Sequence, residues 1–164
     1  MSLATLLKQI DIFFDLPPAH LRMIADVCEE RRCRAGEAIF EENSAGSELY
    51  LIMQGEVEIR LSPTVISPEG PTNNTLVPIA TLQRGQSFGE IALVDQGLRT
   101  ATAVCTVDTL LLVLPRSQLL ALCEANPPLG YHLMRNLAAD LALKIRNTDL
   151  RIREQLLYGP KHSA

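Results

Sequence analysis

The spacing of apolar residues divides the chain into three stretches. From Ser2 to about Glu30, apolar residues recur at helical spacing, and Leu16-Pro17-Pro18 separates two short predicted helices. From Gly36 to about Leu114, short apolar runs have the rhythm of strands. Helical spacing returns at Ser117, and Gly159-Pro160 is expected to end the last helix. The pattern predicts a mainly β domain flanked by helices.

The central stretch alternates apolar and polar positions, as strands with one solvated face do. The strand candidates are Leu49–Met53, Val57–Leu61, Leu76–Leu82, Ala101–Val107 and Leu110–Leu114. Glycines lie between these runs, as turns require. Many short strands with regular turns predict a sandwich or a jelly-roll barrel. The Pro-, Gly- and Asn-rich stretch from Ser62 to Asn74 is expected to be a long, mobile hairpin loop.

The C-terminal stretch predicts a short helix to about Ala125 and a long one that Asn126-Pro127-Pro128 begins. One apolar stripe on the long helix would cover the barrel: Leu133, Leu137, Leu141, Ile145 and Ile152. A second set is spaced in multiples of seven: Leu129, Leu143, Leu150 and Leu157. This set fits either a weak dimer seam, which Asn136 would interrupt, or a further packing face within the domain.

Composition narrows the class of protein. The 164 residues are enough for one domain, and 47% of them are hydrophobic. The net charge of −4 argues against a nucleic-acid-binding surface within this chain, so the run Arg31, Arg32 and Arg34 is interpreted as a solvated helix end. No apolar stretch is long enough to span a membrane, and no signal-peptide pattern is present. We therefore expect a cytoplasmic protein.

Cysteine and histidine are scattered rather than clustered. The four cysteines lack the close spacing of a metal knuckle or a redox motif, which favours small buried hydrophobic side chains. The histidines have no thiol or carboxylate at ligand spacing. A metal-dependent enzyme on a similar barrel, such as a cupin, would need a pair of such ligands. We expect no metal, no cofactor and no catalytic activity.

The segment from Gly85 to Ala101 contains the candidate ligand-binding residues. Gly89 allows the backbone to approach a ligand closely, and a short helical turn after it would direct free amides at an anion. Arg99 supplies a planar cation that suits a phosphate. Glu90 can accept a hydrogen bond from a sugar hydroxyl. Such a site suits a monoanionic phosphate joined to a ribose, because the Lys and metal-binding Ser or Thr of a triphosphate site are missing.

This segment resembles the phosphate-binding cassette of the cyclic-nucleotide-binding domain family, which includes catabolite activator protein-like regulators and kinase regulatory subunits. The matching residues are Phe88-Gly89-Glu90-Ile91-Ala92-Leu93 and Arg99-Thr100-Ala101. Gly36–Phe40, Gly46–Ile52 and the segment from Asn126 onward also resemble family elements, so the likeness covers roughly Leu6 to Leu157. It implies a jelly-roll (double-stranded β-helix) barrel of about eight strands.

The resemblance implies roles for individual residues. Glu90 would bind the ribose 2′-hydroxyl, and Arg99 would pair with the cyclic phosphate. Amides from Gly89 to Ala92 and of Ala101 would complete the phosphate cradle, and Thr100 could bond a phosphate oxygen or the purine. Ile59 and Ile79 would form an apolar wall beside the base, a position that ordinary core residues would equally fill.

The long helix departs from the family pattern. In the family's bacterial regulators a hydroxyl near the position of Lys144 contacts adenine, whereas here Lys144 and Ile145 stand there and Thr148 lies a turn further on. We expect cAMP to be favoured over cGMP. We also expect the helix to be displaced or frayed in the free protein. On binding, residues near Leu141, Lys144, Ile145 and Thr148 would close over the purine.

The sequence thus predicts a cyclic-nucleotide sensor spanning residues 1–158, with a β-roll at about 36–114, a hinge and long helix at about 117–158, and a disordered tail at 159–164. A ligand-free barrel that serves in dimerisation or protein interaction is the alternative. A helix-turn-helix domain would need about seventy more residues. We therefore expect a free-standing sensor or the sensor piece of a transcription regulator, kinase or channel.

Overall fold

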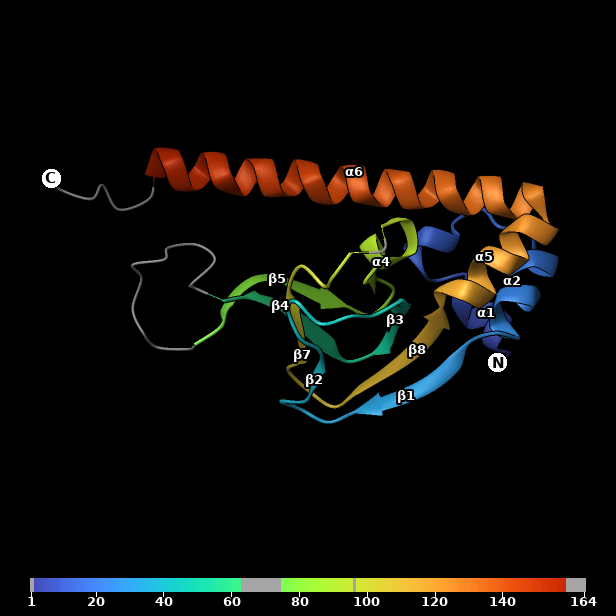
Figure 1. Ribbon diagram of the computed structural model, residues 1–164, viewed down its shortest axis with the longest axis horizontal. Helices are drawn as coiled ribbons and strands as arrows, with labels where there is room; N and C mark the ends of the chain where they lie inside the picture. Colours follow the sequence, from blue (N-terminus) through green and yellow to red (C-terminus); the bar gives the residue numbers. More distant parts are fainter. Residues whose placement is uncertain (1, 63–74, 96, 159–164) are drawn as a thin grey trace, which may run out of the picture.

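A computed structural model describes residues 2–62, 75–95 and 97–158. Its centre is a β-roll of two four-stranded antiparallel sheets (Figure 1). The first sheet has the order β1-β8-β3-β6 and the second the order β2-β7-β4-β5. The strand bounds are β1 Glu29–Cys33, β2 Ala38–Phe40, β3 Glu48–Gln54, β4 Glu56–Leu61, β5 Val77–Gln83, β6 Ser87–Phe88, β7 Thr102–Cys105 and β8 Thr109–Pro115. The predicted mainly β fold with flanking helices is confirmed.

Helices lie at one end of the roll and along one side of it (Figure 1). Their bounds are α1 Leu3–Leu7, the 3-10 turn η1 Asp11–Phe13, α2 Pro18–Ala25, α4 Ile91–Val94, α5 Arg116–Ala125 and α6 Pro127–Tyr158. Pro18 occupies the first turn of α2, where its missing N–H costs no helical bond. The predicted start and end of the long helix agree with α6.

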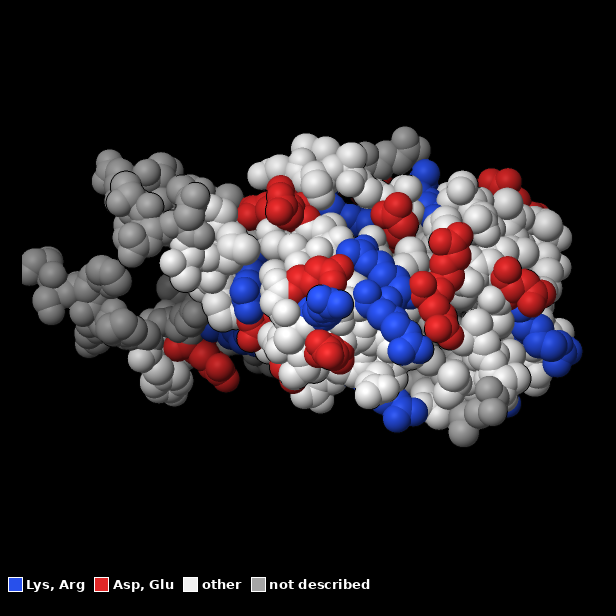
Figure 2. Space-filling model, turned by 90° about the horizontal axis from the view of Figure 1, so that it is seen from below, with Lys and Arg blue, Asp and Glu red and all other residues white. Residues whose placement is uncertain are grey.

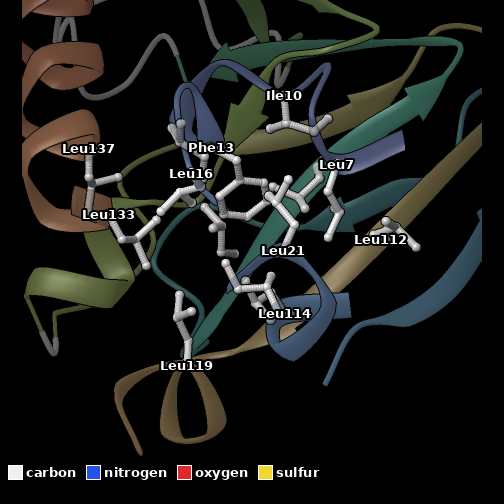
Figure 3. Packing of buried hydrophobic residues seen from close by; sticks show 14 of the residues in the cluster. Leu7, Ile10, Phe13, Leu16, Leu21, Leu112, Leu114, Leu119, Leu133 and Leu137 are labelled. Atoms are coloured by element: carbon white, nitrogen blue, oxygen red, sulfur yellow. The ribbon is translucent and has the colours of Figure 1, made fainter. Parts of the chain in front are cut away.

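Two apolar clusters hold these layers together. One joins α1, η1, α2, α5 and α6 to the outer side of strands β3 and β8, and Figure 3 shows 14 of its residues, among them Leu7 and Leu137. The other fills the roll and includes Tyr50, Val57, Phe88 and Cys105. The first cluster fixes the base of α6 against the domain, and the second supports the strands that carry the predicted cassette.

The interpretation of the arginine run as a helix end is wrong. Glu29–Cys33 form β1, which pairs with β8 in a register that joins Arg31 to Leu111. Arg31 also forms an ion pair with Glu37 and donates to the carbonyl of Ile39. Four of the five strand residues face solvent at least partly, so the segment has no apolar alternation to mark it. The β-structure therefore begins at Glu29 rather than at Gly36.

Burial of the two predicted apolar stripes of α6 depends on position along the helix rather than on the face of the helix. Leu129, Leu133 and Leu137 are fully buried in the first cluster, and Leu141 packs against it. Leu129 is therefore a core residue and not a seam position. Asn136 does not interrupt a seam either, because its side-chain amide donates to the carbonyls of Ile12 and Phe14. The other predicted stripe members are exposed: Leu143, Ile145, Leu150, Ile152 and Leu157.

Two predictions lie outside the described residues, namely the loop, which falls at 63–74, and the tail at 159–164. No helix within the described part of the chain is long and apolar enough to span a bilayer. Figure 2 shows basic and acidic side chains interspersed on the face that it presents, without an expanse of one charge.

Candidate functional site

The cassette predicted from the sequence forms a compact unit between β6 and β7, on the side of the roll that α6 covers (Figure 1). Ser87 and Phe88 form β6, which pairs with β3, and the Phe88 ring stacks on Tyr50 at a centroid distance of 5.2 Å. Gly89 then takes φ +79°, a conformation that glycine adopts without strain. The one-turn helix α4 follows it. The glycine turn thus places the residues after it under α6.

Arg99 is the most firmly held side chain of the site. Its side chain is 4% exposed. Nη2 donates to the carbonyl of Glu48 at 3.0 Å and to its carboxylate at 3.1 Å, and Nη1 donates to the carbonyl of Gly89 at 3.3 Å. The guanidinium carbon lies 4.3 Å from the ring centroid of Phe40, within cation–π range. Because donors on both terminal nitrogens are fixed, the guanidinium is preorganised.

Two glycines make room for this guanidinium. A Cβ on Gly46 would lie 2.6 Å from Arg99 Nε, and a Cβ on Gly89 would lie 2.8 Å from Nη1 and 3.0 Å from the carbonyl oxygen of Glu48. Real Cβ atoms essentially never come that close. The main chain of Arg99 is fixed as well, because its N–H donates to Ser44 and its carbonyl accepts from Asn43. The site is therefore shaped around one arginine.

Several donors in this unit have no acceptor within the described part of the chain. Arg99 Nε is buried and unpartnered, which is costly unless a ligand or water satisfies it. The amides of Glu90, Ile91 and Ala101 make no hydrogen bond either, whereas the amide of Ala92 donates to Gly89 at 3.2 Å. The amides of Glu90, Ile91 and Ala101 are thus available to the expected cradle, and the Ala92 amide is already engaged. Unused donors beside a fixed cation are the features that an anion would need.

Glu90 is buried at the start of α4, and it pairs with Lys144 of α6. Nζ of Lys144 lies 2.6 Å from Glu90 Oε1, 2.7 Å from Asp140 Oδ2 and 2.9 Å from the carbonyl oxygen of Ser87. Burial alone would lower the pKa of Lys144, but the charge of Glu90, with that of Asp140, raises the pKa above its usual value. The ammonium therefore remains charged, and it ties α6 to the cassette.

The structure brings together only part of the predicted base pocket. Leu141 and Ile59 are half-buried against the two apolar clusters. Ile145 is 63% exposed and Ile79 is 40% exposed, so neither is enclosed in this arrangement. Thr148 is exposed too, and its hydroxyl donates to the carbonyl of Lys144 within its own helix.

The remaining cassette residues line the same turn. Phe88, Ala92 and Ala101 are buried, whereas Ile91 is 45% exposed and Thr100 lies at the surface. The contact that this turn makes with Arg99 is a backbone one, since the carbonyl of Gly89 accepts from Nη1.

The residues that position the Arg99 guanidinium and the Lys144 ammonium were not predicted from the sequence. Phe40, Gly46 and Glu48 surround Arg99, and Asp140 shares the Lys144 ammonium with Glu90. Three of them stand in segments that resemble the family, yet local spacing assigned them no function. Asp140 lies one turn before Lys144, and that spacing was the available signal for their ion pair.

Comparison with known proteins agrees with this geometry. The family model described as "Cyclic nucleotide-binding domain" matches residues 30–126, more than half of the chain. The chain is 34% identical over 146 residues to the protein named "Cyclic AMP receptor protein" of Thermus thermophilus, which covers 89% of this chain and 62% of that protein. It is also 35% identical over 98 residues to cGMP-dependent protein kinase, isozyme 1, of Drosophila melanogaster, which covers 60% of this chain and 12% of the kinase.

Among solved structures, a cyclic nucleotide-binding domain from Methylobacillus flagellatus has the same fold. It superposes with a TM-score of 0.78 at 24% sequence identity and covers 93% of this chain and 82% of that chain. The chain spans less than two thirds of the Thermus receptor and a small part of the kinase.

Proposed function

The chain belongs to the cyclic nucleotide-binding domain family, and we propose that it is a regulatory sensor that binds a cyclic mononucleotide and catalyses nothing. We propose cAMP as the preferred ligand over cGMP. The relative that matches along 89% of this chain is named a cyclic AMP receptor protein, which favours cAMP, although the kinase relative carries cGMP in its name. A cytoplasmic location remains a prediction.

The observation that carries the proposal is the buried, preorganised Arg99. Its Nη1 and Nη2 atoms are held by Gly89 and Glu48, while Nε stays buried without a partner. A cyclic phosphate monoanion would supply the missing acceptor, and the amides of Glu90, Ile91 and Ala101 would bind its other oxygens. The buried carboxylate of Glu90 would accept the ribose 2′-hydroxyl. Thr100 would add a hydroxyl at the rim.

Thermal unfolding in the presence of nucleotides tests the proposal. Ligands that bind only the folded state raise its stability by mass action. At a hundredfold excess over Kd, cAMP is expected to raise Tm by about 5 °C or more. We expect cGMP to raise Tm less at the same concentration, and 5′-AMP, whose phosphate is an open dianion, to leave it unchanged. No shift with either cyclic nucleotide would refute the proposed function.

Movement of α6 is the proposed route by which binding is transmitted. A ligand can act only through a difference in affinity between two conformations. Lys144 is half-buried, whereas the side chains after it on α6 whose burial the structure describes are exposed. Arg151 donates to the carbonyl of Ile79 on β5, but this part of the helix otherwise has few contacts with the roll. A bound purine would add apolar surface for Leu141 and Ile145 to cover.

Hydrogen exchange should therefore slow in one part of α6 on binding. We expect amides from Leu137 to Leu150 to exchange about tenfold more slowly with saturating cAMP, because local opening of the helix becomes costlier. Amides of α2, which lies at the other end of the domain, serve as the internal control. Identical exchange in both states would contradict the closing of α6 over the ligand.

We further propose that two copies pair through the C-terminal half of α6, because its apolar residues lack a partner in the described part of the domain. Leu143, Leu150 and Leu157 are 54%, 53% and 72% exposed and are spaced by seven. This spacing favours a parallel helix pair. The same observation favours the alternative function, a dimerisation module that binds no nucleotide.

Light scattering on variants tests the pairing. Leu150→Glu places like charges at the seam and is expected to convert dimer to monomer. Ile152→Glu is the matched control, because it adds the same charge about 200° further round the helix and should leave the dimer intact. A wild-type chain that remains monomeric at high protein concentration would contradict the pairing.

A further inference from the structure

The ion-pair cluster between α6 and the cassette has a function that the sensor proposal alone does not assign. A lysine ammonium has three N–H donors, and Lys144 has three oxygens around it, from Glu90, Asp140 and Ser87. Nζ donates to Glu90 Oε1 and to the carbonyl of Ser87, while Asp140 Oδ2 lies at ion-pair distance without a hydrogen bond. The side chain of Lys144 is 30% exposed, whereas that of Glu90 is only 8% exposed, so Lys144 is the more accessible partner of this buried carboxylate.

The ammonium of Lys144 competes with a ligand for one oxygen of Glu90. Nζ lies 2.6 Å from Oε1, so a ribose 2′-hydroxyl directed at this oxygen meets an acceptor that is already in use. The side chain of Glu90 is only 8% exposed, so a sugar has little room to approach it while Lys144 stays in contact with it. A sugar that binds at Oε1 must displace the ammonium.

Asp140 lowers the cost of this displacement. It lies one helical turn before Lys144, and its Oδ2 is 2.7 Å from Nζ. When Lys144 leaves Glu90, the ammonium keeps a carboxylate partner on its own helix, so no charge is left unpaired in a partly buried place. Because Asp140 and Lys144 both belong to α6, this exchange breaks the ion pair between Lys144 and Glu90 without separating Lys144 from Asp140.

We propose that Lys144 is a gating residue that holds Glu90 in the free chain and that a ligand carrying a ribose 2′-hydroxyl binds by displacing it onto Asp140. This inference rests on the proposed function. Lys144 acts here as a competitor of the ligand, so its charge lowers affinity even though the ligand is an anion. It also makes the 2′-hydroxyl the group that breaks the contact between Glu90 and Lys144.

Calorimetric titration of Lys144→Met with two probes tests the gate. The first probe is cAMP, and the second is 2′-deoxy-cAMP, which has no hydroxyl to compete for Glu90. For cAMP, Lys144→Met is expected to bind about fivefold more tightly than the wild-type chain, because no ion pair has to be broken. For 2′-deoxy-cAMP, the affinity should change less than twofold, because Lys144 stays on Glu90 in that complex.

Two further variants control this experiment. Arg146→Met removes a neighbouring positive charge from an exposed position of α6 that makes no ion pair with described residues, and it should change neither affinity. Lys144→Gln keeps a neutral donor for Glu90, so it should show a smaller gain with cAMP. Lys144→Gln also replaces Lys144→Met in the test if the circular dichroism melting curve shows that Lys144→Met is unfolded.

The outcomes separate the gate from the sensor proposal. Unchanged or weaker cAMP binding by Lys144→Met and Lys144→Gln would overturn the gate alone, since it would make Lys144 neutral or helpful to the ligand. An equal gain with both probes would also overturn it. If neither the wild-type chain nor any variant binds either probe, the proposed function fails, and the gate fails with it. Binding by Lys144→Met in the absence of measurable wild-type binding would support both.

Discussion

Replacing Arg99 with lysine is expected to weaken cAMP binding at least tenfold, or by about 1.4 kcal/mol. The substitution keeps the charge but removes the planar fork. In the wild-type chain, Nη2 is held by Glu48 and Nη1 by Gly89, which leaves Nε for the phosphate. A single ammonium on a flexible stem cannot reproduce these three directions at once.

The matched control is Arg31→Lys. Arg31 also pairs with a glutamate, Glu37, but it lies on the edge strand β1, and its side chain is 35% exposed. Its replacement should leave the dissociation constant within about twofold, because exposed ion pairs contribute little. Arg99→Lys with wild-type affinity would remove Arg99 from the ligand site.

Replacing Gly89 with alanine is expected to destabilise the fold by about 3 kcal/mol and to abolish measurable cAMP binding. One part of the cost is conformational, since Gly89 has φ +79°. The other part is steric, because the new Cβ would meet Arg99 Nη1 at 2.8 Å and the main-chain oxygen of Glu48 at 3.0 Å. The guanidinium would have to leave the position in which its Nε faces the ligand.

The variant Gly36→Ala separates the conformational cost of adding a Cβ from the steric cost. Gly36 has a similar φ of +84°, and a Cβ there would meet nothing within 4 Å. It should lose only the conformational part, about 1 kcal/mol, and should bind cAMP normally. Urea unfolding of both variants, followed by titration of each with cAMP, measures the difference. Equal stability losses in the two variants would show that the space beside Gly89 is not occupied as described.

The strands and helices that the sequence predicts well are those with clear periodicity. The runs around Leu51, Ile59 and Leu112 alternate or form short apolar blocks, and each lies in a strand. Prolines at the start of α2 and α6 mark those helices as expected. Strand β1 was missed because Glu29 to Arg32 are charged, and their extended form depends on pairing with β8.

The long helix shows a different limit. Its apolar spacing continues past Leu141, so the pattern predicts that Ile145 and Ile152 are buried like Leu133. Burial is decided by what lies beneath the helix. Leu133 meets the first apolar cluster, whereas Ile145 and Ile152 are exposed. Periodicity reports the face of a helix but not where its partner ends.

The sequence predicts which residues form the site but not which residues they contact. Glu90 and Arg99 were found by local motif, and both are buried in the cassette. Their partners are distant in sequence: Glu48 is 51 residues from Arg99, and Lys144 is 54 residues from Glu90. Only the packing of α6 against the roll brings Lys144 to Glu90. The gate proposed above therefore emerges from the tertiary structure alone.

Calorimetric titration of the wild-type chain with cAMP and with cGMP under identical conditions would show whether the domain is a cyclic-nucleotide sensor. We expect saturable binding of one nucleotide per chain, with cAMP bound more tightly than cGMP and with 5′-AMP giving no saturable heat. A folded chain that gives no saturable binding with either cyclic nucleotide would contradict this expectation and would leave the barrel as an interaction module.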